Sequence, residues 1–157
     1  MAILVVRHAK AGDRSRWEGP DEPRPVTKAG RAQAEALVEV LAGFDVERVL
    51  SSPYLRCVQT VEPLAAARGL TVERRDELAE GAGQPARELV RRLAAETSRD
   101  VVACTHGDVV YDVVGPHVGG GAVAAAMKKG STWVLETANG QVVGARHLEP
   151  PRGVRDS

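Results

Sequence analysis

Short, unbroken apolar runs recur along the chain and predict a buried parallel sheet. One run, residues 3–6, ends in Arg7 and His8, and another, residues 101–105, ends in His106. Runs of this length without polar alternation are typical of strands that are covered on both faces. In open α/β sheets, ligands lie beyond the carboxyl ends of the strands. The pattern therefore predicts that side chains from separate strands meet at one edge of the sheet.

Between these runs, apolar residues recur with the helical period of about 3.6. Thr27 is the candidate N-cap of the first helix, whose apolar face comprises Ala36, Leu37, Val40, Leu41 and Phe44. A strand over 46–50 follows. Ser52-Pro53 then predicts the start of the second helix, because serine caps helices and proline is tolerated at the first helical position. Pro63 is expected to kink this helix or to restart it.

The remainder of the chain predicts a third strand, two more helices and a hairpin. The strand is expected over 70–73, and Pro85 predicts the start of a helix. A short helix is expected from Asp108 to a stop at Gly115-Pro116. Asn139-Gly140 separates two strand-like runs, which is the strongest short-range signal for a β-hairpin.

This order of elements predicts an α/β protein. We expect a three-layer α/β/α sandwich, in which a mostly parallel central sheet has helices on both faces and a C-terminal antiparallel hairpin at its edge. A chain of 157 residues suffices for one domain, which we place at 1–149, followed by a disordered tail over 150–157.

Composition narrows the classes of function. The formal net charge is zero, which gives no general affinity for a nucleic acid polymer or an anionic membrane. No apolar run approaches the roughly 20 residues that span a bilayer. The first strand follows Met1 too closely for a signal peptide, so we expect a cytoplasmic protein. Cys57 and Cys104 form no CxxC pair and are expected to be buried thiols.

The strand ends carry the candidate chemistry. Arg7 and His8 follow the first strand, Arg56 lies in the first turn of the helix after the second, and His106 and Gly107 precede another helix. Arginine side chains and helix N-termini both favour phosphate oxygens, so the assembly suits a phosphoryl group. Because neighbouring side chains on a strand point to opposite faces, the backbone must leave the strand at about His8 for both residues to reach one pocket.

Residues 9–26 contain several glycines and prolines and predict a long loop. Loops of this length in a compact domain are more often functional than idle. Lys10, Arg14, Arg16 and Trp17 are candidates for binding the rest of a substrate, such as a nucleotide or a charged peptide. A solvated loop with Trp17 packed against the body of the protein is an equal alternative.

Four motifs together resemble the histidine phosphatase superfamily, also called phosphoglycerate mutase-like. In chain order they are Arg7-His8-Ala9-Lys10, Thr27-Lys28-Ala29-Gly30 with Gln33 and Ala34, Ser51-Ser52-Pro53 with Arg56, Gln59 and Thr60, and Thr105-His106-Gly107. The opening motif and the compact spacing are most similar to the SixA-type phosphohistidine phosphatases. Through residues 7–12, 30–37 and 129–133, the chain resembles even more closely the histidine phosphatase domain of some actinobacterial Nudix fusions, although no Nudix domain is present here.

The resemblance implies a phosphoglycerate mutase-like fold and a mechanism. His8 would attack phosphorus and become transiently phosphorylated, while Arg7, Arg56 and His106 hold the phosphoryl oxygens. His8 must then be neutral at the attacking nitrogen, so an acceptor should hold its other nitrogen. No metal or other cofactor is expected, because cationic side chains take its place.

The proton donor is a separate question. Leu78-Ala79-Glu80-Gly81 resembles the acidic position of the family, which makes Glu80 the candidate donor to the leaving group. The alternative is a solvated glutamate, and SixA-type members work without such an acid. The backbone of Gly107 is expected to contact the substrate, and Asp108 is expected to be a helix cap.

The predicted function is hydrolysis of a phosphorylated small molecule, such as a nucleotide, or of a phosphohistidine-bearing protein. Mutase activity is disfavoured, because the chain lacks the insertions that build a bisphosphate pocket. Two alternatives remain: a metal-dependent hydrolase with His8, His106, Glu80 and Asp108 as ligands, and a module that only binds phosphorylated partners. The sequence leaves the oligomeric state open.

Overall fold

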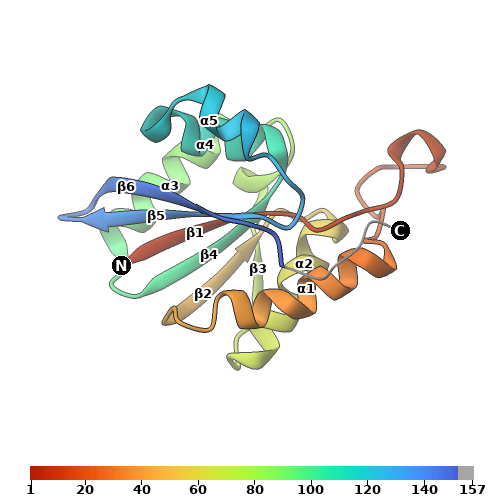
Figure 1. The fold of residues 1–157 in the computed structure, drawn as a ribbon, viewed down its shortest axis with the longest axis horizontal. Coiled ribbons are helices and arrows are strands. Elements are labelled where there is room, and N and C mark those ends of the chain that lie inside the picture. The colour runs from red at the N-terminus through yellow and green to blue at the C-terminus, as the bar shows by residue number, and fades with distance from the viewer. Residues whose placement is uncertain (152–157) are drawn as a thin grey trace.

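A single six-stranded sheet forms the centre of the structure, a computed structural model that describes residues 1–151. The strands are β1 (Ala2–Arg7), β2 (Val46–Ser51), β3 (Val72–Arg74), β4 (Asp100–Thr105), β5 (Thr132–Ala138) and β6 (Gln141–Leu148), in the order β3-β2-β4-β1-β5-β6. The first four of that order run parallel, whereas β5 and β6 are antiparallel to their neighbours (Figure 1). The mostly parallel sheet with a hairpin at its edge is confirmed.

Helices cover both faces of this sheet, as Figure 1 shows. They are α1 (Lys28–Val40), α2 (Leu55–Ala67), α3 (Gln84–Glu96), α4 (Gly107–Val118) and α5 (Gly120–Ala125), with short 3-10 turns η1 (Arg14–Arg16) and η2 (Asp76–Leu78). Helices α1 and α2 pack on one face, and α3, α4 and α5 on the other. The predicted three-layer architecture is therefore confirmed. We propose that residues 1–149 form one domain, because all six strands join one sheet.

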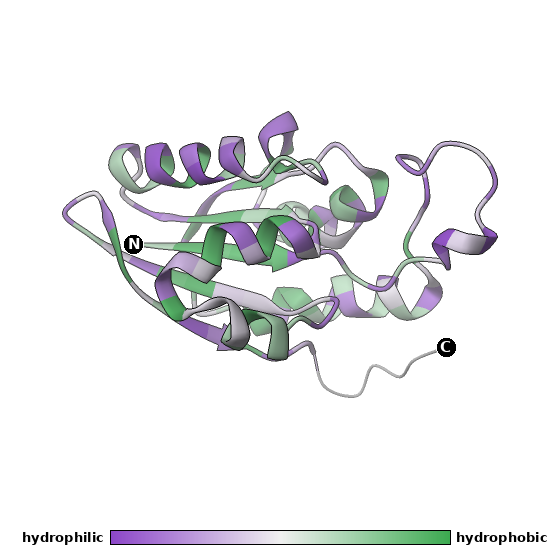
Figure 2. Ribbon diagram, turned by 90° about the horizontal axis from the view of Figure 1, so that it is seen from above, coloured by the Kyte–Doolittle hydropathy of each residue, from purple (hydrophilic) through white to green (hydrophobic). Residues whose placement is uncertain are grey.

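The buried central strands explain the unbroken apolar runs. In β1, Ile3 and Val5 belong to the core beneath α3 and α4, whereas Leu4 and Val6 belong to the core beneath α1 and α2. Apolar colour accordingly fills the middle strands and the inward faces of the helices (Figure 2). Since successive side chains on a strand alternate between faces, both faces must be apolar where both are covered.

Local signals fixed several element boundaries. The Thr27 Oγ1 accepts a hydrogen bond from the Gly30 N–H at 3.1 Å, which is the predicted N-cap of α1. Pro85 lies in the first turn of α3. Asn139 and Gly140 both have positive φ, 53° and 75°, as a two-residue hairpin turn of the primed type requires.

Two boundary predictions were wrong. Helix α2 begins at Leu55 with Tyr54 as its N-cap, not at Ser52-Pro53. The helix continues through Pro63, so of the two outcomes expected there the restart does not occur. Helix α4 runs through Gly115-Pro116, and the chain breaks at Gly119, where φ is +91°. Packing on the sheet outweighs the single backbone hydrogen bond that each proline removes.

The end of the chain is only partly described. Of the predicted tail, residues 152–157 lie outside the described residues, and Pro151 is buried. Within residues 1–151, no helix is both long and apolar enough to span a membrane.

Candidate active site

A cavity of about 630 Å³ lies at the carboxyl ends of β1 and β4. It is lined by Arg7, His8, Lys10, Ala11, Gly12, Asp13, Arg14, Arg24, Thr27, Glu80, His106, Gly107, Asp108 and Lys129. Most of these residues come from the strand ends, the start of α4 and the loop 9–26, and Thr27, Glu80 and Lys129 come from the start of α1, the turn after η2 and the segment before β5. The loop projects beyond the sheet at the end opposite the N-terminus (Figure 1). The predicted convergence of strand ends on one site is therefore present in the structure.

The backbone turns out of β1 directly after Arg7. The His8 N–H donates to the Thr105 carbonyl at 3.0 Å, and the Gly130 N–H donates to the carbonyls of Arg7 and His8, both at 3.1 Å. The Ala9 N–H then donates to Thr60 Oγ1 at 2.8 Å. Because β1 ends at Arg7, the strict alternation of side chains ends there as well, and both Arg7 and His8 reach the cavity.

His8 is buried and uncharged. Its Nδ1 lies 2.8 Å from the Ala9 carbonyl oxygen, which only accepts hydrogen bonds, so Nδ1 carries the proton and Nε2 keeps a free lone pair. Burial, together with the charges of the nearby His106, Arg56 and Arg7, lowers the pKa of His8 from 6.5 to about 3, and the hydrogen bond to the Ala9 carbonyl opposes this shift only in part. A neutral imidazole with one committed nitrogen is the arrangement that a nucleophilic histidine requires.

His106 lies beside His8, with ring centroids 5.5 Å apart in an edge-to-face arrangement. Its Nε2 is 2.9 Å from Ser52 Oγ and 3.6 Å from Cys57 Sγ, and its Nδ1 accepts from Arg56 Nη2 at 3.4 Å. Ser52 is therefore a support for His106 rather than the cap of α2. Both predicted thiols, Cys57 and Cys104, are free and buried.

Arg7 is held against the start of α4. Its Nη1 donates to the Met127 carbonyl at 3.1 Å, and its Nε is buried without a hydrogen-bond partner among residues 1–151. A Cβ on Gly107 would lie 3.1 Å from the Arg7 Cζ, closer than ordinary packing distance. Gly107 therefore leaves the space that the Arg7 guanidinium occupies.

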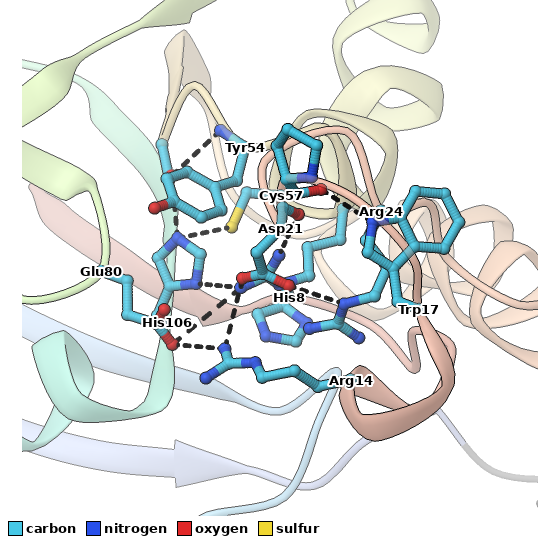
Figure 3. A network of polar contacts seen from close by, with 12 residues as sticks. His8, Arg14, Trp17, Asp21, Arg24, Tyr54, Cys57, Glu80 and His106 are labelled. Carbon is cyan, nitrogen blue, oxygen red and sulfur yellow. Dashed lines mark hydrogen bonds and ion pairs between the residues drawn. The ribbon is translucent and has the colours of Figure 1, made fainter.

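Arg56 is fully buried and does not line the cavity. Its Nη2 donates to Asp21 Oδ2 at 3.0 Å, and its Nη1 donates to the Asp21 carbonyl at 3.2 Å. Asp21 Oδ1 also accepts from Arg24 Nε at 2.8 Å, and Asp21 lies among Arg14, Arg24 and the two histidine rings in Figure 3. Burial raises the pKa of Asp21, but the pairs with Arg24 and Arg56 outweigh burial and lower it.

Sequence reasoning assigned no role to Asp21 or to Arg24. Asp21 belongs to none of the four motifs, and its partner Arg56 lies 35 positions away in the chain. The one available signal was weak: a carboxylate within a loop rich in arginine. A buried arginine needs an anion, and the loop supplies it.

Glu80 lines the cavity and is tied to the loop. Its Oε1 accepts from Arg14 Nη2 at 2.7 Å and lies 4.0 Å from Arg56 Nη2. Asp108 Oδ2 accepts from the Gly81 N–H at 2.7 Å. Asp108 thus fixes the turn that carries Glu80 and does not cap α4, whose N-cap is His106. The prediction of a cap at Asp108 was wrong, because the nearby turn supplies a competing backbone donor.

Comparison with known proteins identifies the family. The model of the histidine phosphatase superfamily (branch 1) matches residues 3–84. The chain belongs to this superfamily. An 8-oxo-(d)GTP phosphatase from Mycolicibacterium smegmatis is 38% identical over 156 residues, which are 95% of this chain and 48% of that protein. The chain therefore spans about half the length of this curated relative.

Solved structures agree with the fold of this histidine phosphatase. The protein histidine phosphatase SixA, complexed with tungstate, superposes with a TM-score of 0.77 at 21% identity and covers 99% of this chain and 100% of that one. A mycobacterial glucosyl-3-phosphoglycerate phosphatase complexed with VO3 gives a TM-score of 0.74 at 18% identity, over 96% and 98% of the two chains. The predicted phosphoglycerate mutase-like fold and superfamily are confirmed.

The predicted substrate-binding residues of this histidine phosphatase divide into two groups. Lys10, Arg14 and Gly107 line the cavity, whereas Arg16 and Trp17 do not. Arg16 is exposed and lies 3.9 Å from Asp13. The indole N–H of Trp17 donates to the Pro20 carbonyl at 2.7 Å, within the loop itself (Figure 3). A role for Arg16 and Trp17 in binding substrate therefore stays a prediction, because neither side chain lines the cavity in this structure.

The residues predicted as ligands for a metal-dependent hydrolase form hydrogen bonds to other groups instead. His8 and His106 are hydrogen-bonded to the Ala9 carbonyl and to Ser52, respectively, and Glu80 accepts a hydrogen bond from Arg14. Within residues 1–151, no three histidine, cysteine or acidic side chains are grouped to hold a metal ion.

Proposed function

We propose that this histidine phosphatase hydrolyses phosphate esters without a metal ion, through a covalent phosphohistidine on His8. The neutral His8 ring, with Nδ1 committed to the Ala9 carbonyl, is the observation that carries the proposal. An unprotonated Nε2 in a cavity lined by Arg7 and His106 is a nucleophile placed where a phosphoryl group is attracted.

The reaction has two steps. In the first, a bond forms between His8 Nε2 and phosphorus while the bond from phosphorus to the leaving oxygen breaks. Arg7 and His106, which line the cavity, stabilise the charge on the three remaining oxygens, and Arg56 joins them once the phosphoryl group displaces Asp21 from it. Each charge-assisted hydrogen bond contributes roughly 1.5–3 kcal/mol. In the second step, water attacks phosphorus, the bond to Nε2 breaks, and phosphate leaves.

Two unpartnered atoms support this role of the arginines. The Nε atoms of Arg7 and Arg56 are both buried without a hydrogen-bond partner among the described residues. A buried donor without a partner costs about 1–3 kcal/mol. A bound phosphoryl group offers acceptors to such donors, so binding it removes part of this cost.

We propose a phosphorylated small molecule of nucleotide size as the substrate. The cavity of about 630 Å³ lies within the usual range of roughly 300–1,000 Å³ for small-molecule sites. The relative that covers 95% of this chain at 38% identity is named for a nucleotide substrate. A phosphohistidine-bearing protein is the second candidate, because the fold of the protein histidine phosphatase SixA covers 99% of the chain.

Glu80 is the proposed proton donor for ester substrates. It lines the cavity with His8 and His106. A carboxylate bonded to a guanidinium has no proton to give, so the contact with Arg14 must open before Glu80 acts. Glu80→Gln should therefore slow esters with poor leaving groups far more than activated aryl esters. Equal slowing of both classes would remove this role from Glu80.

His8→Ala tests the nucleophile. The variant should lose hydrolysis of p-nitrophenyl phosphate while its circular dichroism and urea midpoint stay close to those of the wild type. His117→Ala is the matched control, because His117 is exposed near the end of α4 and does not line the active-site cavity. Turnover by His8→Ala above background would contradict the assignment.

Three further readouts separate the alternatives. Rapid quenching of the wild type should trap a phosphoryl label that is stable in base, labile in acid and absent from His8→Ala. Full activity in excess EDTA, with inhibition by vanadate, is expected of the metal-independent mechanism, whereas loss of activity in EDTA would favour the metal-dependent one. Phosphate binding by the wild type without any turnover would identify a binding module.

A further inference from the structure

Two lysines line the active-site cavity outside the phosphoryl site. Lys10 follows the end of β1, and Lys129 precedes β5, so the two are far apart along the chain. Neither belongs to the group of Arg7, His8 and His106 at the proposed phosphoryl site. Their position in the same cavity raises the question of which anion they bind.

The backbone of both lysines is fixed by one buried side chain. Gln33 of α1 is 7% exposed. Its Oε1 accepts from the Lys10 N–H at 2.9 Å, and its Nε2 donates to the Lys129 carbonyl at 3.1 Å. A Cβ on Gly130 would lie 2.8 Å from Gln33 Nε2, so glycine at this position leaves room for the bridge. Gln33 therefore holds the two lysine backbones at one rim of the cavity.

This rim is next to the nucleophile. The Gly130 N–H, one residue after Lys129, donates to the carbonyls of Arg7 and His8. The segment that carries Lys129 is thus attached to the residues that carry the reaction. An anionic group bonded to the scissile phosphoryl group would lie within reach of this rim.

The electrostatic surroundings of Lys129 favour an anion. Burial lowers the pKa of Lys129, and the charges of Arg7, Arg24, Lys10 and Arg56 lower it further. Lys129 forms no ion pair with a carboxylate of residues 1–151, whereas the preceding lysine, Lys128, pairs with Glu149 at 3.4 Å.

Arg24 and Asp13 also lie at this rim, and both are hydrogen-bonded within the loop. Arg24 is bonded to Asp21 and to the Gly12 carbonyl. Asp13 also lines the cavity, but its carboxylate accepts from the N–H and the hydroxyl of Ser15. These hydrogen bonds lower the pKa of Asp13, so its carboxylate stays charged, but its single negative charge faces the four positive charges of Arg7, Lys10, Arg24 and Arg56 around Lys129.

We propose that Lys129 and Lys10 form a second anion subsite, which binds the phosphate next to the scissile phosphoryl group. The substrates of this site are then nucleoside diphosphates or triphosphates, which carry a phosphoanhydride bond, rather than simple monoesters. This inference rests on the proposed function, because it places the second phosphate relative to a phosphoryl group on His8.

Cleavage of a phosphoanhydride bond requires no proton from Glu80. His8 Nε2 forms a bond to the terminal phosphorus, and the bridging P–O bond breaks, with its electron pair leaving on the oxygen of the adjacent phosphate. A phosphate has a second pKa near 6, so this leaving group needs little protonation at neutral pH. Lys129 and Lys10 stabilise its charge, and water then releases inorganic phosphate from His8 and gives a proton to solvent. Glu80 is not required, in agreement with its pairing to Arg14.

Lys129→Met tests the subsite, because methionine keeps a long apolar stem and removes the charge. We measure kcat/KM for guanosine diphosphate and for p-nitrophenyl phosphate in EDTA and take their ratio. Loss of one charge-assisted contact should lower this ratio by about tenfold or more. Lys128→Met is the matched control, since Lys128 is exposed and does not line the cavity, and its ratio should equal that of the wild type.

A second variant covers the case in which Lys129→Met does not fold. Gln33→Leu removes both hydrogen bonds to the lysine backbones and keeps much of the side-chain volume, so the same ratio should fall. Inorganic pyrophosphate should also inhibit the wild type more strongly than inorganic phosphate, and Lys129→Met should narrow that difference.

The outcomes separate the two proposals. Two results would overturn the subsite and leave the proposed function intact. One is a ratio in Lys129→Met equal to that of the wild type, and the other is a wild type that hydrolyses only the aryl ester. Persistent turnover by His8→Ala would instead remove the phosphohistidine mechanism, whatever the ratio shows.

Discussion

The neutral state of His8 makes the stability of the fold depend on pH. His8 is 6% exposed, and burial together with its cationic neighbours lowers its pKa from 6.5 to about 3. His8→Asn is the informative perturbation, because the asparagine amide still offers a donor towards the Ala9 carbonyl but does not titrate. The difference between the two proteins in the pH dependence of the free energy of unfolding therefore measures the contribution of His8 protonation.

The sign and the size follow from linkage. Below pH 6.5 the unfolded chain protonates His8, whereas the folded chain does not do so until about pH 3. The unfolded state therefore binds more protons in this window, and stability falls as the pH is lowered from 6.5 towards 3. At pH 5 the difference covers roughly 1.5 units, each worth about 1.36 kcal/mol, so His8 should cost about 2 kcal/mol.

Urea denaturation at pH 7 and pH 5 measures this cost. The free energy of unfolding of the wild type should fall by about 2 kcal/mol more than that of His8→Asn between the two pH values. Burial also lowers the pKa of His147, but His147 is present in both proteins and its effect cancels. Equal pH dependence in the two proteins would show that His8 is not held neutral, and the nucleophile assignment would lose its physical basis.

Two further changes probe the arginines. Gly107→Ala should displace the Arg7 guanidinium, because the new Cβ would lie 3.1 Å from its Cζ, and should lower kcat/KM for p-nitrophenyl phosphate by about tenfold or more. Gly115→Ala in the same helix is the control: its new Cβ has open space around it, so the activity should stay near that of the wild type. Asp21→Asn removes the carboxylate from buried Arg56, so the free energy of unfolding should fall by about 1–3 kcal/mol. Vanadate should then raise the melting temperature more in Asp21→Asn than in the wild type, and an equal shift in both would separate Asp21 from the phosphoryl site.

Much of the fold was predictable because its signals are local. The alternation in β1 could be inferred from a run that is apolar at every position, since both faces of that strand are covered. Asn139-Gly140 specifies its turn through two positive φ angles, which these residues tolerate. Thr27 caps α1 through a contact three residues away. In each case the decisive contact lies close in sequence or follows from a regular period.

The errors arise where a distant contact competes with a local signal. Ser52-Pro53 has the composition of a helix start, but the Ser52 hydroxyl contacts His106, which lies 54 positions away. Asp108 has the position of a cap, but its carboxylate accepts from Gly81, which lies 27 positions away. Helix-capping propensities reflect only residues that are close in sequence, so they cannot predict a hydrogen bond to a residue that is distant in the chain.

The contact between Asp21 and Arg56 is likewise distant in sequence, since it spans 35 positions. It also explains why Arg56 does not line the cavity. The Asp21 carboxylate holds the Arg56 guanidinium at 3.0 Å from the side of the loop. A phosphoryl group carries about 1.5–2 negative charges near neutral pH, against one for a carboxylate, and it offers more acceptor oxygens. An arginine that already satisfies a carboxylate would therefore gain by exchanging it for the substrate. We expect the loop to move when the site is filled, and the vanadate shift in Asp21→Asn measures how much binding energy that exchange consumes in the wild type.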